Sequence, residues 1–370
     1  MHAASPARAR IDALDARLIR LVQERAAISA GIQTTRVAAG GSRLDLAREA
    51  EIIHTYSRAL GPVVGRDLGC LVLKACRGQA AAAVGGGRHG FLGPAGTFTE
   101  VALDALGGVP ASERVALPSV PAALEAVREG EVADAVVPLE NSHSEAVIET
   151  LDELALGQPV TITGEVWLPV EFVLAARPGT ALDDVAVVAT HPQAFAQTSG
   201  WLEAHLPRAV FEPASSTAEA AETLGRPGRV HNAAICSPAA AARYGLQVLA
   251  PDLLAPHSAH TRFVRVRAAA ATTPSGQDLT SVVVGMQGRQ LSHVVTELAS
   301  ARVPMVRMHS RLHGAQSDRE RFLWLDCSGH IHDEKLAQSL SRLSDVFDVR
   351  YLGSYPACPH TALATTGGAA

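Results

Sequence analysis

The hydrophobic rhythm of this chain changes twice along its length, and this feature restricts it to a multidomain fold. Residues 8–79 carry apolar side chains at three- and four-residue steps, which is typical of amphipathic helices. From His89 to about Val266, short apolar runs alternate with helical patterns, as in α/β domains. Residues 279–356 follow the order strand, helix, strand, strand, helix, strand. We therefore predict an all-α domain at 1–84, an α/β domain at 88–268 and a ferredoxin-like βαββαβ domain at 278–357.

The composition argues against several classes of protein. A formal charge of −5 without basic runs argues against a nucleic-acid or anionic-membrane partner. No apolar run approaches the roughly 18 residues that cross a bilayer. The five cysteines are scattered and never in C-x-x-C spacing, which fits a reducing compartment and predicts neither disulfides nor a zinc site. We expect a cytoplasmic protein without a metal or organic cofactor.

An apolar stripe runs along the first predicted helix and continues into basic residues. Arg8, Arg25 and Arg36 extend the stripe at the same three- and four-residue steps. A buried guanidinium must meet a carboxylate or an anionic ligand, because an unpaired buried cation is costly. Two roles for these arginines remain open: they could form ion pairs across a helix bundle, or they could bind an anionic ligand. The apolar members of the stripe are Ile11, Leu14, Leu18, Leu21, Ile28 and Ile32.

The segments I-D-A-L-D-A-R-L-I-R-L-V-Q-E-R (11–25) and L-D-L-A-R-E (44–49) resemble the all-helical chorismate mutases. The resemblance implies a bundle that holds the dicarboxylate chorismate in a chair-like shape, without a protein nucleophile. Three positions depart from the family: Arg36 replaces a lysine, and Cys76 and Ala80 stand where a serine and a glutamine are usual. A purely structural bundle therefore remains open. The residues that match mutase positions are Arg8, Arg25, Arg36, Asp45, Arg48 and Glu49.

Four polar motifs in the α/β region each adjoin a predicted strand. They are G-P-A-G-T-F-T-E (93–100), P-L-E-N-S (138–142), T-H-P-Q-A-F-A-Q (190–197) and H-T-R-F-V-R-V (260–266). Strand ends are where ligands usually lie in α/β proteins, and a glycine turn before a helix offers free N–H groups to an anion. Taken singly, each motif is also compatible with a helix cap or a structural turn.

In this order and spacing, the four motifs resemble the prephenate dehydratase family over some 180 residues. The resemblance implies a two-lobed α/β fold with periplasmic-binding-protein-like topology and prephenate in the cleft between the lobes. It implies Thr261 at the leaving hydroxyl, with Asn141, Ser142 and Gln197 orienting the ring. Further catalytic candidates are Glu140 and Thr190, and the expected substrate-binding residues are Gly96, Thr97, Thr99, Arg262 and Phe263, of which Arg262 and the 96–99 loop would hold carboxylates.

Three positions depart from the dehydratase pattern. Glu145 replaces a glycine, Thr190 replaces a serine, and the second residue before Thr261, commonly an asparagine, lies in the stretch Ser258-Ala259-His260 and is Ala259. A carboxylate near the cleft should weaken binding of a dianion unless it points away. The departures keep two rivals open, namely a prephenate decarboxylase that does not aromatise the ring and a catalytically silent ligand sensor.

Residues 279–356 resemble an ACT domain, the module with which this family senses phenylalanine, usually through paired domains in an oligomer. The resemblance implies phenylalanine as effector and a homo-oligomer formed through the mutase-like and ACT domains. The sensing stretches are altered, because they read Gly288-Arg289-Gln290-Leu291 and His309-Ser310-Arg311-Leu312. A dimerisation module without effector therefore remains open. The effector candidates are Gly288, Leu291, Ser310 and Arg311.

Overall fold

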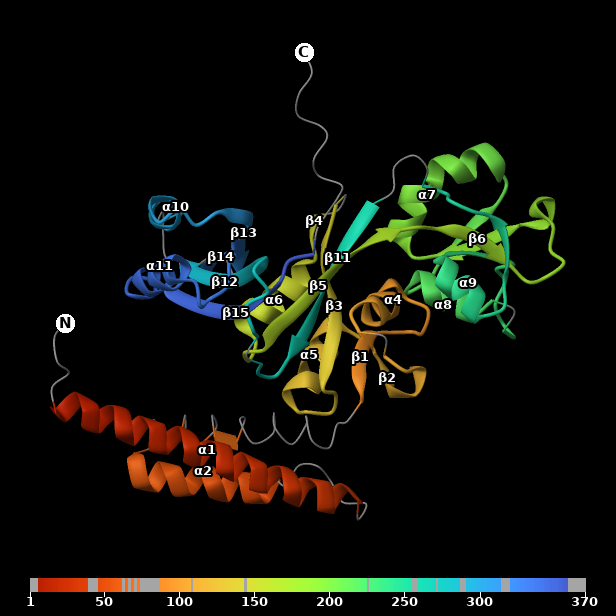
Figure 1. Cartoon of the computed structure of the whole chain (residues 1–370). Coiled ribbons are helices and arrows are strands. Elements are labelled where there is room, and N and C mark those ends of the chain that lie inside the picture. Colours follow the sequence, from red (N-terminus) through yellow and green to blue (C-terminus); the bar gives the residue numbers. More distant parts are fainter. Residues whose placement is uncertain are drawn as a thin grey trace. The chain divides into compact units, whose positions relative to one another are not determined.

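The computed structural model divides the chain into two compact units, Met1–Arg88 with Ala126–Ala133 and His89–Glu125 with Asp134–Ala370. It describes residues 6–38, 46–61, 64–65, 68–69, 72–73, 87–107, 109–142, 145–224, 226–254, 259–270, 272–286, 291–313 and 320–358. Within these ranges, no helix has the length and apolarity needed to cross a membrane. The α-helices shown in Figure 1 are α1 (Pro6–Ala38), α2 (Leu46–Leu60), α4 (Phe98–Ala105), α5 (Val120–Arg128), α6 (Ile148–Leu156), α7 (Pro192–His205), α8 (Thr217–Glu222), α9 (Pro238–Arg243), α10 (Leu291–Ser300) and α11 (Glu334–Ser344).

The first unit contains the long helix α1 and the shorter α2 (Figure 1). The sequence predicts that the apolar stripe of α1 is buried, but the chain does not bury it. All six apolar members of the stripe are more than half exposed, from Leu21 at 52% to Ile28 at 58%. Arg8 is also exposed, whereas Arg25 is half-buried. An exposed stripe of this size is unusual for a monomer, since large apolar surfaces mark interaction sites.

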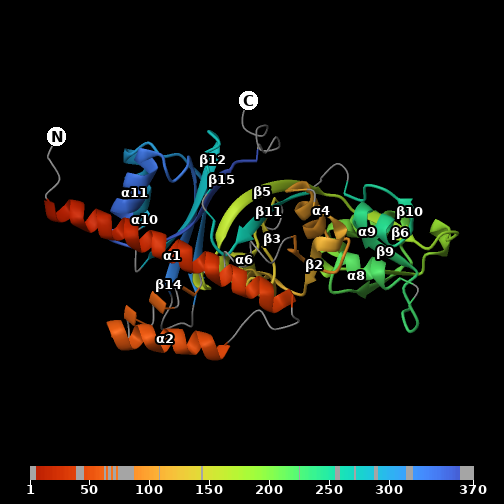
Figure 2. The ribbon, with the colours of Figure 1, turned by 60° about the horizontal axis from the view of Figure 1, so that its bottom comes forward.

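The second unit begins with lobe 1, a mixed sheet in the order β2-β1-β3-β11-β5, with β4 paired to β3. Strands β1, β2 and β3 run parallel, whereas β11 pairs antiparallel with both β3 and β5. Phe91, Leu103, Val136 and Phe263 pack together in its core. Figure 2 shows the long curved path of β5. The strands are β1 (His89–Leu92), β2 (Arg114–Leu117), β3 (Asp134–Asn141), β4 (Glu145–Ala146), β5 (Thr161–Val170) and β11 (Ala259–Arg267).

Lobe 2 is inserted between β5 and β11 and has a second sheet in the order β10-β6-β9-β7-β8. Its core includes Leu174, Val188 and Ile235, each at most 1% exposed. The chain enters lobe 2 after β5 and returns to lobe 1 through β11, which produces the expected two-lobed α/β fold. The strands are β6 (Val173–Ala176), β7 (Val187–Thr190), β8 (Val210–Pro213), β9 (Ala233–Cys236) and β10 (Gln247–Ala250).

The C-terminal sheet, β12–β15, is antiparallel in the order β13-β14-β12-β15. Together with α10 and α11 it has the βαββαβ order that the sequence predicts. Val282, Leu298, Leu323 and Leu340 form one core, so both helices cover the same face of the sheet (Figure 2). The strands are β12 (Asp278–Met286), β13 (Met305–His313), β14 (Glu320–Ser328) and β15 (Asp348–Pro356).

Strand β15 of the C-terminal sheet lies directly against β5 of lobe 1. Gly353 has φ +140, and a Cβ at this position would lie 2.2 Å from the Ile162 carbonyl oxygen. Only glycine fits this contact, because any side chain would meet backbone that is held in a sheet. Arg350 adds two bonds nearby, since its Nη1 donates to the carbonyl oxygens of Leu154 (3.3 Å) and Gly157 (2.6 Å).

Candidate active site

A cleft of about 510 Å³ lies between the two lobes and collects residues from the ends of several strands. Parallel strands place their carboxyl ends at one edge of a sheet, which explains why distant motifs meet here. Lobe 1 contributes Leu92, Gly93, Thr97, Phe98, Thr99, Pro118, Ser119, Val120, Pro138, Asn141, Glu149, Val170, Thr261 and Phe263, and the lobe 2 side contributes Phe172, His191, Gln193, Ala194, Gln197, Ser215, Ser216 and Thr217.

The cleft contains a hydrogen-bonded pair of polar side chains from two neighbouring strands. Thr261 of β11 lies opposite Asn141 of β3, and the Asn141 Nδ2 donates to the Thr261 Oγ1 at 2.9 Å. Thr261 is 8% exposed. An amide that donates to a hydroxyl oxygen leaves the hydroxyl proton free to be directed elsewhere. Thr261 can therefore donate a hydrogen bond to a ligand oxygen in the cleft.

Four helices begin at this cleft, and each start is capped by a side chain that lines it. Thr97 accepts from the Glu100 N–H at the start of α4. Ser119 accepts from the Ala122 N–H at the start of α5. At the start of α7, the Nδ1 of His191 accepts from the Gln193 N–H. At the start of α8, the Ser216 hydroxyl accepts from the Glu219 N–H. Helix N-termini present free N–H groups and a partial positive charge, so the cleft favours anions.

The described residues that line the cleft include no arginine and no lysine. The positive potential therefore comes from helix starts and polar hydrogens, and not from cationic side chains. An imidazole that accepts at Nδ1 carries its proton at Nε2, so His191 adds one more N–H donor. Glu149 is an acidic lining residue, but its side chain is exposed to solvent.

The structure brings six of the expected dehydratase residues to the cleft. They are Thr97, Thr99, Asn141, Gln197, Thr261 and Phe263. Gly96 supports the cleft from behind: its φ is +90, and a Cβ there would lie 3.0 Å from the Ala240 Cα. Its carbonyl oxygen accepts from the Ser237 Oγ at 2.9 Å, which joins lobe 1 to lobe 2.

The structure places Arg262 differently from the expectation that it holds a substrate carboxylate. Its guanidinium is 1% exposed and binds the carboxylates of Glu165 and Asp326, at 2.7 Å and 2.6 Å. Neighbouring residues on a strand point to opposite faces of the sheet. Thr261 faces the cleft, so Arg262 faces away from it. Glu140 takes the same outward face beside Asn141, with its Oε2 3.3 Å from the Arg307 Nε.

Two further expected residues do not line the cleft. Thr190 is fully buried, and its Oγ1 donates to the Ile235 carbonyl oxygen at 2.8 Å, which makes it a support of the lobe 2 sheet. Ser142 is exposed, and its Oγ accepts from the His260 N–H at 2.9 Å. The side chain of Glu145 lies outside the described residues, and Ala259, where an asparagine is common, is buried in β11.

Several lining residues were not assigned a role from the sequence, among them Ser119 and Ser215. These two lie two residues after β2 and β8. The available signal was their position just after a strand, combined with helix-capping residue types. This signal identifies the cleft-facing loops, but it does not separate caps from ligand contacts.

The expected effector residues of the C-terminal domain do not form one site in the described chain. Leu291 is exposed at the start of α10, Ser310 accepts from the Arg321 Nη1 at 3.0 Å, and Arg311 pairs with Asp152 at 3.1 Å. Gly288 lies outside the described residues. Asp45, Cys76 and Ala80 also lie outside the described residues, as do the side chains of Arg36, Arg48 and Glu49.

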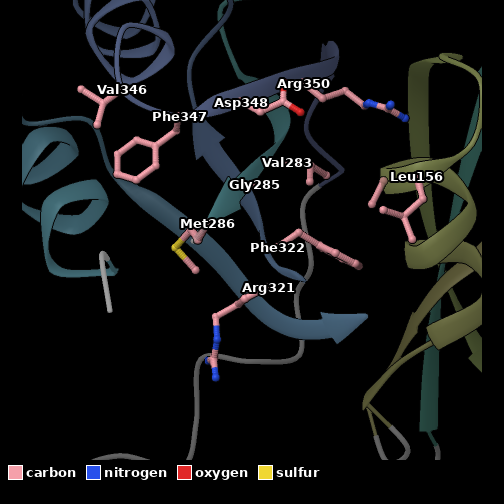
Figure 3. A pocket seen from close by; sticks show the side chains of 11 residues that line it. Leu156, Val283, Gly285, Met286, Arg321, Phe322, Val346, Phe347, Asp348 and Arg350 are labelled. Carbon is pink, nitrogen blue, oxygen red and sulfur yellow. The ribbon is translucent and has the colours of Figure 1, made fainter. Parts of the chain in front are cut away.

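A second cavity of about 400 Å³ lies between the end of α6 and the C-terminal sheet (Figure 3). Leu156 of α6 and Phe322 of β14 face it from opposite sides (Figure 3). Arg321, Asp348 and Arg350 add charges of both signs, and Arg350 is already bonded to carbonyl oxygens of the α6 segment. This cavity shares no residue with the cleft.

The fold and the cleft together define a two-lobed α/β protein whose cleft presents a hydroxyl–amide pair and several helix starts. The sequence profile of the prephenate dehydratase family matches residues 89–271. The prephenate dehydratase of Mycolicibacterium vanbaalenii is 42% identical over 283 residues, which are 72% of this chain and 90% of that protein. The chain belongs to the prephenate dehydratase family.

Two solved structures are also similar to this chain. The prephenate dehydratase of Arthrobacter aurescens in complex with L-Phe has 40% identity and a TM-score of 0.67, covering 73% of this chain and 90% of that one. GqqA, described as a quorum-quenching acylase, has 28% identity and a TM-score of 0.64, covering 73% of this chain and 98% of that one.

Proposed function

We propose that this chain converts prephenate to phenylpyruvate, carbon dioxide and water. The observation that carries the proposal is the Asn141–Thr261 pair at the cleft, at 2.9 Å, in a member of this family. In the reaction, the bond from the ring to its carboxylate breaks and its electron pair enters the ring. The ring hydroxyl then leaves with a proton as water, and aromatisation supplies the driving force.

Each part of the cleft has a task in this reaction. The Thr261 hydroxyl donates a hydrogen bond to the leaving oxygen, and Asn141 fixes the direction of that hydroxyl. Donors aimed at the place where charge develops stabilise the transition state most effectively. Threonine is a weak acid, so its role is to direct a hydrogen bond, and the proton itself comes from solvent.

The starts of α4, α5 and α7 bind the two carboxylates of prephenate. A helix start binds a carboxylate through N–H groups, so it can hold the carboxylate that stays on the product. A buried arginine would instead form a tight ion pair with the carboxylate that leaves as carbon dioxide. Gln197 and Phe263 line the same space and orient the ring.

The proposal is tested by incubating the purified full-length chain with prephenate and following phenylpyruvate by its absorbance in alkali. We expect turnover in proportion to the enzyme concentration. Binding of prephenate without any product would overturn the proposal and leave the ligand-sensor alternative.

We also propose that the helical first unit is a chorismate mutase that pairs with a second copy through α1. The exposed apolar stripe supports this, since a bundle of this kind needs another helix against that face. Substitution Arg25→Ala is expected to lower chorismate turnover by about 100-fold or more, because it removes a cation from the predicted ligand site. Prephenate turnover by the same variant should stay within about twofold of wild type, and unchanged chorismate turnover would contradict the mutase assignment.

The C-terminal domain is proposed to be an ACT domain that binds phenylalanine in the oligomer, as the L-Phe complex of the Arthrobacter aurescens relative suggests. Leu291, Ser310 and Arg311 are the described candidates. We expect saturating phenylalanine to lower the rate of phenylpyruvate formation and glycine to leave it unchanged. An identical rate with and without phenylalanine would support a dimerisation module that has lost its effector.

A further inference from the structure

A largely buried cluster of charges lies on the face of the lobe 1 sheet opposite the cleft, and its Arg307 and Glu140 side chains are 14% and 20% exposed. It contains two arginines, Arg262 and Arg307, and three carboxylates, Glu140, Glu165 and Asp326. Arg262 binds Glu165 at 2.7 Å and Asp326 at 2.6 Å. Arg307 lies 3.3 Å from Glu140 and 3.6 Å from Asp326. Two of these five residues, Arg307 and Asp326, come from the C-terminal sheet, so the cluster joins that sheet to the strands of the catalytic pair.

Asp326 is held in place by its own sheet before it meets Arg262. The Ser281 Oγ and the Trp324 Nε1 donate to its Oδ1, at 2.6 Å and 3.0 Å. Tyr355 adds a further contact, because its hydroxyl oxygen accepts from the Arg262 Nη2 at 2.9 Å. Trp324 and Asp326 are completely buried. A carboxylate fixed in this way offers a rigid anchor for a guanidinium.

The charges in this cluster are maintained by their pairing. Burial would raise the pKa of the Asp326 carboxyl, but Arg262 and the Ser281 hydroxyl hold that pKa below its ordinary value. Burial would likewise lower the pKa of the Arg262 guanidinium. The interactions with Asp326, Tyr355 and Glu165 raise this pKa by more, so that it lies well above its ordinary value. Removal of one partner therefore leaves an uncompensated buried charge.

The cluster is adjacent in sequence to both members of the catalytic pair. Arg262 follows Thr261 on β11, and Glu140 precedes Asn141 on β3, while Arg262 and Glu140 lie opposite each other in the register. Because strand neighbours point to opposite faces, fixing Arg262 on one face fixes the tilt of Thr261 on the other. The geometry of the Thr261–Asn141 hydrogen bond therefore depends on the contacts that hold the neighbouring residues on the opposite face of the sheet, Arg262 and Glu140.

We propose that Asp326 of the C-terminal sheet is a positioning residue for the dehydratase reaction, which holds Thr261 at the cleft through Arg262. This inference rests on the proposed dehydratase function. The Asp326–Arg262 contact connects the C-terminal domain to the site, because any movement of β14 relative to β11 shifts Arg262 and, through it, Thr261. Misplacement of a reacting group by about 1 Å can reduce a rate about 100-fold, so a small movement is sufficient.

The test compares the full-length wild type with Asp326→Asn, which keeps the side-chain shape and removes the charge. We expect kcat for prephenate to fall about 10- to 100-fold with KM changed less than about threefold. The matched control is Asp152→Asn, which breaks the Arg311–Asp152 pair between α6 and β13, a pair that includes no residue of the charge cluster. This control should keep kcat within about twofold.

A double-mutant cycle separates positioning from a general loss of structure. In a Thr261→Val background, Asp326→Asn should lower the residual kcat no further, because its effect passes through the threonine hydroxyl. A loss of the same size in both backgrounds would overturn the inference. If Asp326→Asn does not fold, as judged by circular dichroism, Tyr355→Phe replaces it: this variant removes one acceptor of Arg262 and should lower kcat about threefold. Tyr355→Phe with wild-type kcat would then overturn the inference.

Different results would overturn the proposed dehydratase function and the positioning role of Asp326. A wild-type chain that forms no phenylpyruvate would overturn the proposed function and this inference together. An active wild type with an equally active Asp326→Asn variant would overturn only the inference.

Discussion

Substitution Thr261→Val is expected to lower kcat for prephenate about a thousandfold while changing KM only a few-fold. Valine has the shape of threonine, so the cleft keeps its volume, but the donor to the leaving hydroxyl is lost. The Asn141 Nδ2 also loses the acceptor that it holds at 2.9 Å. Because the hydroxyl acts on a bond that breaks in the transition state, the loss should fall on kcat. Steady-state kinetics of phenylpyruvate formation measure both constants.

A matched control for this change is Thr198→Val. Thr198 is also buried and lies on α7 beside Gln197, but its Oγ1 donates to the Ala194 carbonyl oxygen of its own helix at 2.8 Å. We expect kcat within about twofold of wild type, since a helix carbonyl retains its backbone partner. If Thr261→Val retained wild-type kcat, the hydroxyl could not be the group at the leaving oxygen.

Substitution Gly353→Ala is expected to destabilise the second unit by about 3 kcal/mol or more. The residue has φ +140, and an added Cβ would lie 2.2 Å from the Ile162 carbonyl oxygen and 3.0 Å from the Ile162 nitrogen. Both atoms belong to β5, so the strand cannot yield without losing its place in the lobe 1 sheet. Urea unfolding followed by circular dichroism measures the change in the free energy of unfolding.

The control for Gly353→Ala is an alanine substitution at another glycine, for which we expect the opposite effect on stability. Gly200 lies within α7, and a Cβ added there meets no atom within 4 Å. Gly200→Ala should stabilise the protein by about 0.5–1 kcal/mol, because alanine favours the helix. Equal stability of the Gly353→Ala variant and wild type would mean that β15 does not lie against β5 as described.

The alternation of apolar runs and helical patterns was sufficient to predict the α/β region, and the resemblance to the prephenate dehydratases implied its two lobes and the roles of Asn141 and Thr261. Apolar runs that end in polar motifs locate strand ends, and strand ends form clefts in α/β proteins. The motif H-T-R-F also contained the information that Thr261 and Arg262 cannot share a face, because a strand alternates with a period of two. Applied to the neighbours Glu140 and Asn141, the same rule separates the cleft-facing amide from the outward carboxylate.

Other features could not be predicted because they depend on contacts between distant segments. Nothing near Arg262 in the sequence identifies Asp326, 64 positions later, as its partner. The absence of arginine and lysine from the described cleft lining was also unexpected, since the family resemblance implied that Arg262 holds a substrate carboxylate. Helix starts are weaker signals in a sequence than charged residues, although they favour the same ligands.

Dehydratase activity is tested by incubating the full-length chain with prephenate and identifying the product by NMR. We expect the five aromatic ring protons of phenylpyruvate, with the ring hydroxyl lost. A keto acid with a non-aromatic ring that keeps its hydroxyl would rule out dehydration, because Thr261 would then not act on a leaving oxygen.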